Sequence, residues 1–292
     1  MGVKWRNKMG LAYDLQVEAE RRKLNLEQSR TIEVRKKLKF EIHITEHCNL
    51  NCKYCNHFSP LAKNTFLDVE EYERDVKRLS ELFGGEMQQI KLLGGEPLLH
   101  PQINEFIYLT RKYFPIGTIK ILTNGTLLPR MKDEFWKVCQ DTNTIVYYTK
   151  YPIALDVEKI NEQAKKYQVP LEVFNMEDNI KTLIHEPIDL SGKQNAKKNF
   201  YDCYRPNYCI TLKHGVIYTC HRAAHIHLLN EYFGENIPLS AKNGINIYEA
   251  KSGQEILEYL IKPIPMCAYC DREHITTDHE WEISKRERSE FI

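Results

Sequence analysis

Residues 40–55, FEIHITEHCNLNCKYC, lead from a strand-like segment into three closely spaced cysteines. Residues 40–45 are predicted to form a β-strand. Cys48, Cys52 and Cys55 follow with the spacing C-x3-C-x2-C, which puts three thiolates on one short loop. A [4Fe–4S] cluster normally takes four cysteine thiolates, so three would leave one iron open. An open position on a metal centre is expected where chemistry takes place.

The chain after this loop alternates between predicted helices and strands. Residues 68–83 are predicted to be a helix, because Asp68 and Glu71 form a capping box and Gly84-Gly85 ends it. Further helices are expected over residues 101–114, 131–140 and 157–167, and further strands over residues 89–93, 118–122, 144–149 and 171–174. Strands that alternate with helices of this length indicate right-handed crossovers and a parallel sheet. The predicted fold class is therefore α/β.

Two short motifs stand directly after the second and third predicted strands. They are Gly94-Gly95-Glu96-Pro97 and Thr123-Asn124-Gly125. Active sites of parallel sheets gather at the carboxyl ends of the strands. We therefore expect both motifs to meet the cysteine loop on one rim of the sheet.

The cysteine loop, the GGEP turn and the Asn-Gly turn, in this order at successive strand ends, resemble the radical SAM superfamily over roughly residues 39–176. The resemblance implies a partial (β/α)6 TIM-like barrel with a [4Fe–4S] cluster on Cys48, Cys52 and Cys55, and S-adenosyl-L-methionine bound at its open iron. It also implies the residues that contact this cofactor, namely Tyr54 at the adenine, Gly94 and Gly95 by close backbone approach, Glu96 at the methionyl ammonium and Asn124 at the ribose or carboxylate. A structural zinc site is the alternative, but it would leave the two turns without a role.

A second group of cysteines lies near the C-terminal end of the sequence. The order C-x11-G-x4-C…C-x2-C resembles the twitch domain, the shortened SPASM extension of radical SAM enzymes, and implies an auxiliary [4Fe–4S] cluster on Cys203, Cys220, Cys267 and Cys270. Cys209 could replace Cys203, and a structural zinc on the same thiolates is again an alternative. Cys139 falls on the apolar side of its predicted helix, so we expect it in the core.

Three regions are expected along the chain. Residues 1–38 are rich in helix formers and are predicted to be an N-terminal helical extension. Residues 39–200 would form the partial barrel. Residues 201–292 would form a small auxiliary-cluster domain, with a hairpin over residues 209–220 and a helix over residues 252–260.

Composition narrows the classes of function. The formal net charge is +1, from 41 basic and 40 acidic side chains, which disfavours a nucleic-acid partner. Signal-peptide and membrane-span patterns are missing from the sequence, so a cytoplasmic location is expected. Nine cysteines in a reducing compartment favour cluster ligation over disulfides.

The resemblance implies a radical SAM oxidoreductase. It would cleave S-adenosylmethionine reductively to a 5′-deoxyadenosyl radical and abstract hydrogen from a small polar, sugar-like or cyclitol-like substrate. The auxiliary cluster would make the net reaction a two-electron oxidation, with flavodoxin or ferredoxin as the electron donor. Lys150 and Tyr148 are expected as the catalytic base, from their position on the fourth strand only. The alternatives are a peptide- or protein-modifying maturase and a non-catalytic zinc or iron–sulfur scaffold; the oligomeric state is not predicted.

Overall fold

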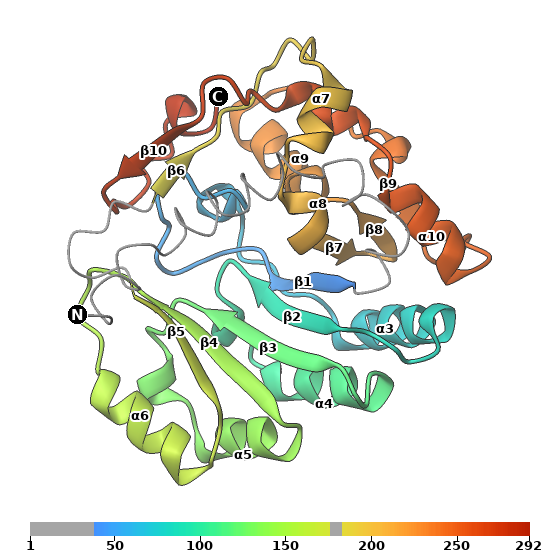
Figure 1. Cartoon of the computed structure of the whole chain (residues 1–292). Coiled ribbons are helices and arrows are strands. Elements are labelled where there is room, and N and C mark those ends of the chain that lie inside the picture. Colours follow the sequence, from blue (N-terminus) through green and yellow to red (C-terminus); the bar gives the residue numbers. More distant parts are fainter. Residues whose placement is uncertain (1–37, 176–182) are drawn as a thin grey trace, which may run out of the picture.

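The computed structural model describes residues 38–175 and 183–292. A parallel sheet with connecting helices forms its first half (Figure 1), as the sequence predicts. The strands are β1 (Lys39–Thr45), β2 (Gln89–Gly94), β3 (Thr118–Thr123), β4 (Thr144–Lys150) and β5 (Leu171–Asn175), and the helices between them are α3 (Val69–Phe83), α4 (Ile103–Tyr113), α5 (Asp133–Asp141) and α6 (Val157–Lys166). The expected N-terminal extension lies outside the described residues, except for Leu38.

The sheet continues beyond β1 into the C-terminal half of the chain. Its strand order is β5-β4-β3-β2-β1-β7-β8-β9, where the last three strands are β7 (Ile210–Lys213), β8 (Val216–Tyr218) and β9 (Gly244–Asn246). Strand β7 is parallel to β1, and β8 and β9 are antiparallel to their neighbours. The α/β fold and the hairpin are thus confirmed. The sixth parallel strand adjoins β1 rather than β5, because the hairpin pairs with the edge of β1 that β2 leaves free.

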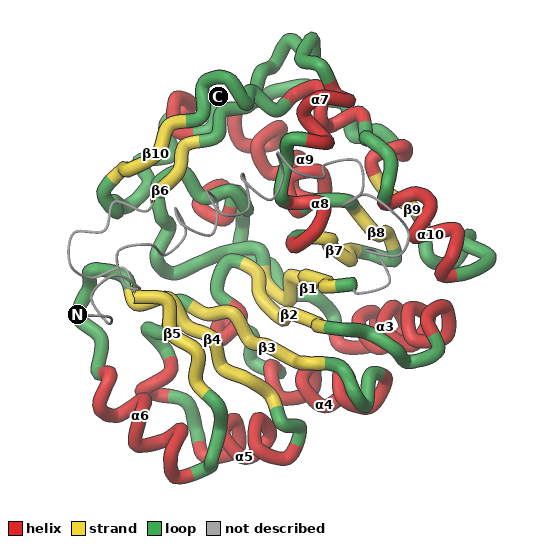
Figure 2. Tube along the Cα trace, in the orientation of Figure 1, coloured by secondary structure: helices red, strands yellow, loops and turns green. Residues whose placement is uncertain are grey.

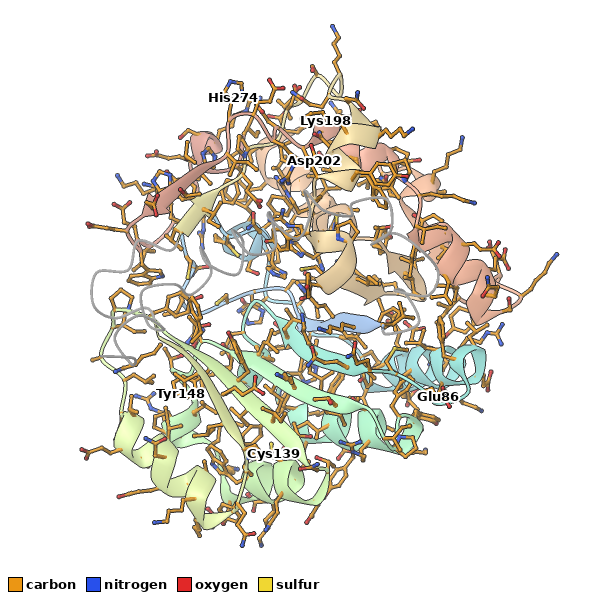
Figure 3. The ribbon with its side chains drawn as sticks, in the orientation of Figure 1. Glu86, Cys139, Tyr148, Lys198, Asp202 and His274 are labelled. Atoms are coloured by element: carbon orange, nitrogen blue, oxygen red, sulfur yellow. The ribbon has the colours of Figure 1, made fainter. Side chains whose placement is uncertain are left out.

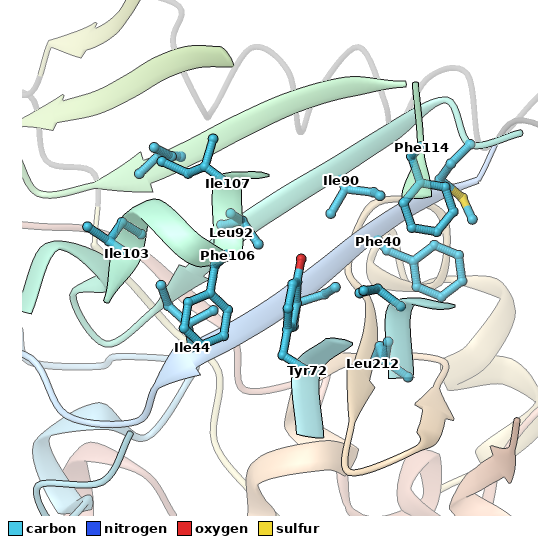
Figure 4. Close-up of a cluster of buried hydrophobic side chains, with 14 of the residues drawn as sticks. Phe40, Ile44, Tyr72, Ile90, Leu92, Ile103, Phe106, Ile107, Phe114 and Leu212 are labelled. Carbon is cyan, nitrogen blue, oxygen red and sulfur yellow. The ribbon is translucent and has the colours of Figure 1, made fainter. Parts of the chain in front are cut away.

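Local signals in the sequence explain where the helices begin and end. The Asp68 carboxylate accepts a hydrogen bond from the Glu71 N–H at 2.9 Å, and Gly84 ends α3 in the left-handed conformation. The apolar side chains of α3 and α4 then cover one face of the sheet. Figure 4 shows Tyr72 and Phe106 packed with Phe40 and other strand residues in this core. Burial of these large side chains is the main stabilising term for the sheet.

The remaining elements gather on the far side of β1, where Figure 2 shows short helices and loops rather than a second extended sheet. They comprise α7 (Ala196–Tyr201), α8 (Arg205–Tyr208), α9 (His221–Phe233), α10 (Gly253–Leu260) and a two-stranded sheet of β6 (Leu183–His185) and β10 (Thr276–His279). A second apolar cluster holds this part together, with Phe58, Leu229 and Phe291 among its buried members.

The chain's last segment returns to the cysteine loop. The Lys53 N–H donates to the Glu282 carbonyl at 2.9 Å, and the Ser284 N–H donates to the Asn51 carbonyl at 2.7 Å. Residues more than 220 positions apart in sequence are therefore bonded backbone to backbone. In the described part of the chain, the helices are too short or too polar to cross a membrane.

Candidate functional site: two cysteine-lined cavities

Three strand ends meet the cysteine loop on one rim. Cys48, Cys52 and Cys55 line a cavity of about 240 Å³. Its walls include residues from both predicted turns and from β4, namely Gly94, Gly95, Thr123, Asn124, Tyr147, Thr149 and Tyr151. The structure thus brings together residues from four successive strand ends, as the topology rule predicts.

The two glycines of the GGEP turn allow the cysteine loop to pack against β2. A Cβ atom on Gly94 would lie 2.0 Å from the Thr45 carbonyl oxygen, and one on Gly95 would lie 1.9 Å from the His47 carbonyl oxygen. The Gly95 N–H donates to the Thr45 carbonyl at 2.9 Å. Only glycine fits here, because the backbone of the loop itself occupies the space of a side chain.

Glu96 lies behind the cavity rather than in its wall. The carboxylate is fully buried and accepts hydrogen bonds from the Leu98 N–H, the Thr123 hydroxyl and the Asn124 N–H at 3.0, 2.6 and 2.8 Å. Burial raises its pKa to about 7, and these hydrogen bonds oppose the shift. Both carboxylate oxygens therefore join the GGEP turn to the Asn-Gly turn.

Hydrogen-bond donors point at the cysteine sulfurs. The Trp281 indole N–H donates to Cys52 Sγ at 3.1 Å, and the Asn124 side-chain amide donates to Cys48 Sγ at 3.7 Å. Burial raises the pKa of Cys48 to about 11 and that of Cys52 to about 12. These thiols would therefore stay protonated at neutral pH unless a metal centre took the protons' place. The hydrogen bonds donated by Trp281 and Asn124 would stabilise negative charge on these sulfurs.

Tyr54 does not line this cavity. Its ring stacks on His185 of β6, with the ring centroids 4.6 Å apart, and approaches His279 of β10 at 4.9 Å. Its contact with adenine stays a prediction.

The expected catalytic base on β4 needs correction. Tyr148 is 1% exposed and belongs to the hydrophobic core beneath Gly125, and Figure 3 labels it and Cys139 in the region of α5 and α6. Side chains alternate along a strand, so Tyr147 and Thr149 face the cavity while Tyr148 and Lys150 do not line it. The alternation itself is the sequence signal that places Tyr147 and Thr149 toward the cavity.

The second group of cysteines also converges. Cys203, Cys220, Cys267 and Cys270 line one small cavity of about 20 Å³. Two buried guanidinium groups stand beside them. Arg205 is paired with the Glu186 carboxylate, and Arg222 donates to the Glu186 carbonyl and to Cys270 Sγ. The Nε atoms of both arginines have no hydrogen-bond partner among the described residues.

The two remaining cysteines lie elsewhere. Cys139 is fully buried in the apolar core, as expected. Cys209 does not line the small cavity, and its sulfur lies close to Glu41 and His221 instead.

The sulfurs of each cysteine group are less closely gathered than the ligands of a single zinc ion. A tetrahedral zinc ion with Zn–S bonds of 2.3 Å would place its sulfurs about 3.8 Å apart. Within the described ranges, the sets of ligand atoms that lie within 4.8 Å of one another include neither group of cysteines. The wider spacing fits a larger centre than one ion.

A row of stacked histidines begins at the first cavity, whose lining includes His57. The His57 ring stacks on His221 and on His43, and His43 stacks on His225, with centroids 4.1, 4.8 and 3.9 Å apart. His57 Nδ1 and His43 Nε2 are 2.8 Å apart. The spacing His221-x3-His225 on one helix face was the available sequence signal.

Comparison with known proteins agrees with the first cavity. The Radical SAM superfamily profile matches residues 42–147. A GTP 3′,8-cyclase of Chlorobaculum tepidum is 39% identical over 32% of this chain and 27% of its own length. A probable GTP 3′,8-cyclase of Pyrococcus abyssi is 31% identical over 53% of each chain. This chain thus spans between about a quarter and about half of these relatives.

A solved structure extends the likeness to most of the fold. The structure of BtrN in complex with AdoMet and 2-DOIA covers 81% of this chain and 93% of its own, with a TM-score of 0.52 and 15% identity. At this identity the likeness concerns the fold alone.

Proposed function

We propose that this chain is a radical SAM enzyme, which cleaves S-adenosylmethionine reductively and oxidises a small polar substrate by two electrons; the match of the superfamily profile to residues 42–147 supports this. The convergence of Cys48, Cys52 and Cys55 on one cavity with Gly94, Gly95 and Asn124 carries this proposal. The bound cluster and S-adenosylmethionine would supply a 5′-deoxyadenosyl radical that removes a hydrogen atom from the substrate.

The protein's own residues hold and orient these groups. The three thiols would ligate the cluster, with Trp281 and Asn124 donating hydrogen bonds to their sulfurs. Glu96 keeps the GGEP and Asn-Gly turns in register from behind, which supports it as a positioning residue rather than as a partner of the methionyl ammonium. The segment over residues 281–284 covers the loop and limits the access of water.

The second cavity supports an auxiliary cluster as the acceptor of the second electron. Its four cysteines complete a ligand set, so this centre would have no open position for substrate. Arg205 and Arg222 are buried beside it; Arg205 pairs with the Glu186 carboxylate, whereas Arg222 donates to the Glu186 carbonyl. A cluster with four thiolate ligands carries net negative charge and would offset the remaining guanidinium charge.

The inner face of the sheet favours a small polar substrate. Lys91 Nζ lies 3.0 Å from Glu41 Oε1, and Lys120 Nζ lies 2.5 Å from Glu172 Oε2. These pairs make the inner face of the sheet polar, and we take this as support for a polar substrate. A flavodoxin or ferredoxin would supply the first electron.

The relatives named GTP 3′,8-cyclase make GTP a second substrate to test. This chain matches at most about half of the length of these relatives, so the similarity does not establish that it acts on the same substrate. A peptide substrate has no support from the contacts of the described residues.

The decisive experiment is anaerobic. Purified protein, reconstituted with iron and sulfide and reduced with dithionite, should release 5′-deoxyadenosine from S-adenosylmethionine, and Cys52→Ala should not. Cys139→Ala, which changes a core thiol, is the matched control and should stay active. The intact protein should contain about eight irons per chain. Absence of 5′-deoxyadenosine from fully loaded protein, or zinc without iron, would overturn the proposal.

A further inference from the structure

We propose that Glu41, Cys209 and His221 form a mononuclear site for a divalent transition metal, separate from both cysteine cavities. Three different chain segments supply the ligands: Glu41 comes from β1, Cys209 follows α8, and His221 begins α9. The carboxylate oxygen, the thiol sulfur and the ring nitrogen all lie within 4.8 Å of one another. This inference does not depend on the proposed reaction.

Strand pairing places these residues together. Glu41 is the register partner of Thr211 in the parallel pair of β1 and β7, which sets Cys209, two residues earlier, beside the inner face of β1. Glu41 and His221 are 4% and 3% exposed. The site is therefore enclosed by the sheet and by the first turn of α9.

Three of the nitrogen and oxygen atoms at this site have no hydrogen-bond partner among the described residues. Lys91 Nζ donates hydrogen bonds to Glu41 Oε1, at 3.0 Å, and to the Tyr208 carbonyl. The other carboxylate oxygen, Glu41 Oε2, is buried and has no hydrogen-bond partner among the described residues. Both ring nitrogens of His221 are likewise buried without a hydrogen-bond partner among the described residues. Each buried polar atom without a partner costs about 1–3 kcal/mol, so three in one place indicate a missing common partner.

The distances suit a shared ion better than a hydrogen bond. His221 Nδ1 and Glu41 Oε2 are 3.7 Å apart, which is too long for a hydrogen bond. Two ligands at about 2.1 Å from one tetrahedral ion lie about 3.4 Å from each other. One ion between these atoms would therefore need only a small adjustment.

The mixture of ligands selects the class of ion. One sulfur, one imidazole nitrogen and one carboxylate oxygen suit Zn²⁺ or Fe²⁺, whereas Mg²⁺ and Ca²⁺ prefer oxygen ligands alone. Three protein ligands leave a fourth position for water or for a ligand atom, as in catalytic zinc sites.

A neighbouring group of three possible metal ligands already has a positively charged side chain beside it. His43, Glu46 and His225 also place ligand atoms within 4.8 Å of one another. There, however, Lys213 Nζ lies 2.7 Å from Glu46 Oε1 and 3.2 Å from His225 Nδ1. Lys213 thus contacts two residues of this group, and His225 Nδ1 also lies 2.9 Å from Glu46 Oε2. In the proposed site, by contrast, the hydrogen bond of Lys91 is to Glu41 alone. We therefore assign no ion to this group of His43, Glu46 and His225, which serves as a control.

The test counts metals on cluster-loaded protein. Protein reconstituted anaerobically with iron and sulfide is dialysed against Zn²⁺ and measured for zinc, iron and sulfide. The wild type should bind about one zinc per chain with unchanged iron. Cys209→Ser and Glu41→Gln should weaken zinc binding at least tenfold and keep their iron. Cys139→Ser and His225→Gln should bind zinc as the wild type does.

Cobalt provides a second readout that does not depend on activity. Co²⁺ in place of Zn²⁺ should give a near-ultraviolet thiolate-to-cobalt absorption band in a zinc-free sample, and Cys209→Ser should abolish it. Failure of the wild type to bind zinc would overturn the proposal. Loss of iron from Cys209→Ser would also overturn it, because Cys209 would then be an auxiliary-cluster ligand. Formation of 5′-deoxyadenosine is not a readout here, so the two proposals fail separately.

Discussion

At the scale of single residues, the closest packing in the site is at Gly95. A Cβ atom there would lie 1.9 Å from the His47 carbonyl oxygen, so Gly95→Ala must displace the cysteine loop. We expect it to lower the free energy of unfolding by at least about 3 kcal/mol and to prevent iron binding. Denaturant titration and iron analysis test this.

Gly234→Ala is the matched control for that change. Gly234 has a positive φ, unlike Gly95, and a Cβ atom there would meet no atom within 4 Å. Its cost should be about 1 kcal/mol, with full iron content. Equal effects of the two substitutions would contradict the role assigned to close packing at Gly95.

Trp281 should raise the midpoint potential of the cluster that Cys52 would ligate. Trp281→Phe removes the N–H donor to Cys52 Sγ while keeping an aromatic ring. Hydrogen bonds to sulfur stabilise the more negative reduced form, so the midpoint potential should become more negative. A redox titration followed by electron paramagnetic resonance measures it. Trp136→Phe, a change in the core at an indole N–H without a partner in the described residues, should leave the potential unchanged.

Glu96 should make the stability of the cluster-free protein depend on pH. Burial raises its pKa from 4.5 to about 7, so its contribution is fully present below pH 4.5 and is lost as the pH rises through 7. The contribution is on the order of 3 kcal/mol. The difference in unfolding free energy between wild type and Glu96→Gln should change across this window. A constant difference from pH 4 to pH 8 would rule out this titration.

At the scale of elements, the C-terminal segment acts as a cover for the cysteine loop. Ser284→Pro removes the N–H that bonds the Asn51 carbonyl at 2.7 Å. We expect faster loss of iron to a chelator and destabilisation of about 1 kcal/mol or more. Ser284→Ala keeps this N–H and loses the hydroxyl's hydrogen bonds with the Glu290 carboxylate and the Arg286 N–H, so its iron should be lost more slowly than that of the proline variant.

The elements themselves were predictable because their signals are local. The capping pair Asp68 and Glu71, the Gly84 stop and the helical spacing of apolar residues all act within a few positions. The end of each parallel strand likewise follows from sequence, which is why the three motifs were expected on one rim. Side-chain alternation along β4 is a local signal too, and it places Tyr147 rather than Tyr148 toward the cavity.

At the scale of the whole molecule, the two cavities should divide one reaction between them. Cys267→Ala should retain formation of 5′-deoxyadenosine, lose about four irons per chain and fail to form oxidised product. The physical reason is that hydrogen abstraction needs only the first cavity, whereas removal of the second electron needs an acceptor. Product analysis with the identified substrate checks this, and unchanged product formation would remove the second cavity from the reaction.

The sequence by itself determined the alternating fold, the two groups of cysteines and the turns around the first group. These features depend on short-range periodicity and on fixed ligand spacing. Only the tertiary structure decided that β7 adjoins β1, that Trp281 bonds Cys52, and that Cys203 rather than Cys209 joins the other three cysteines. Each of these is a contact between segments far apart in the chain, and such contacts arise from the packing of whole elements rather than from any local pattern.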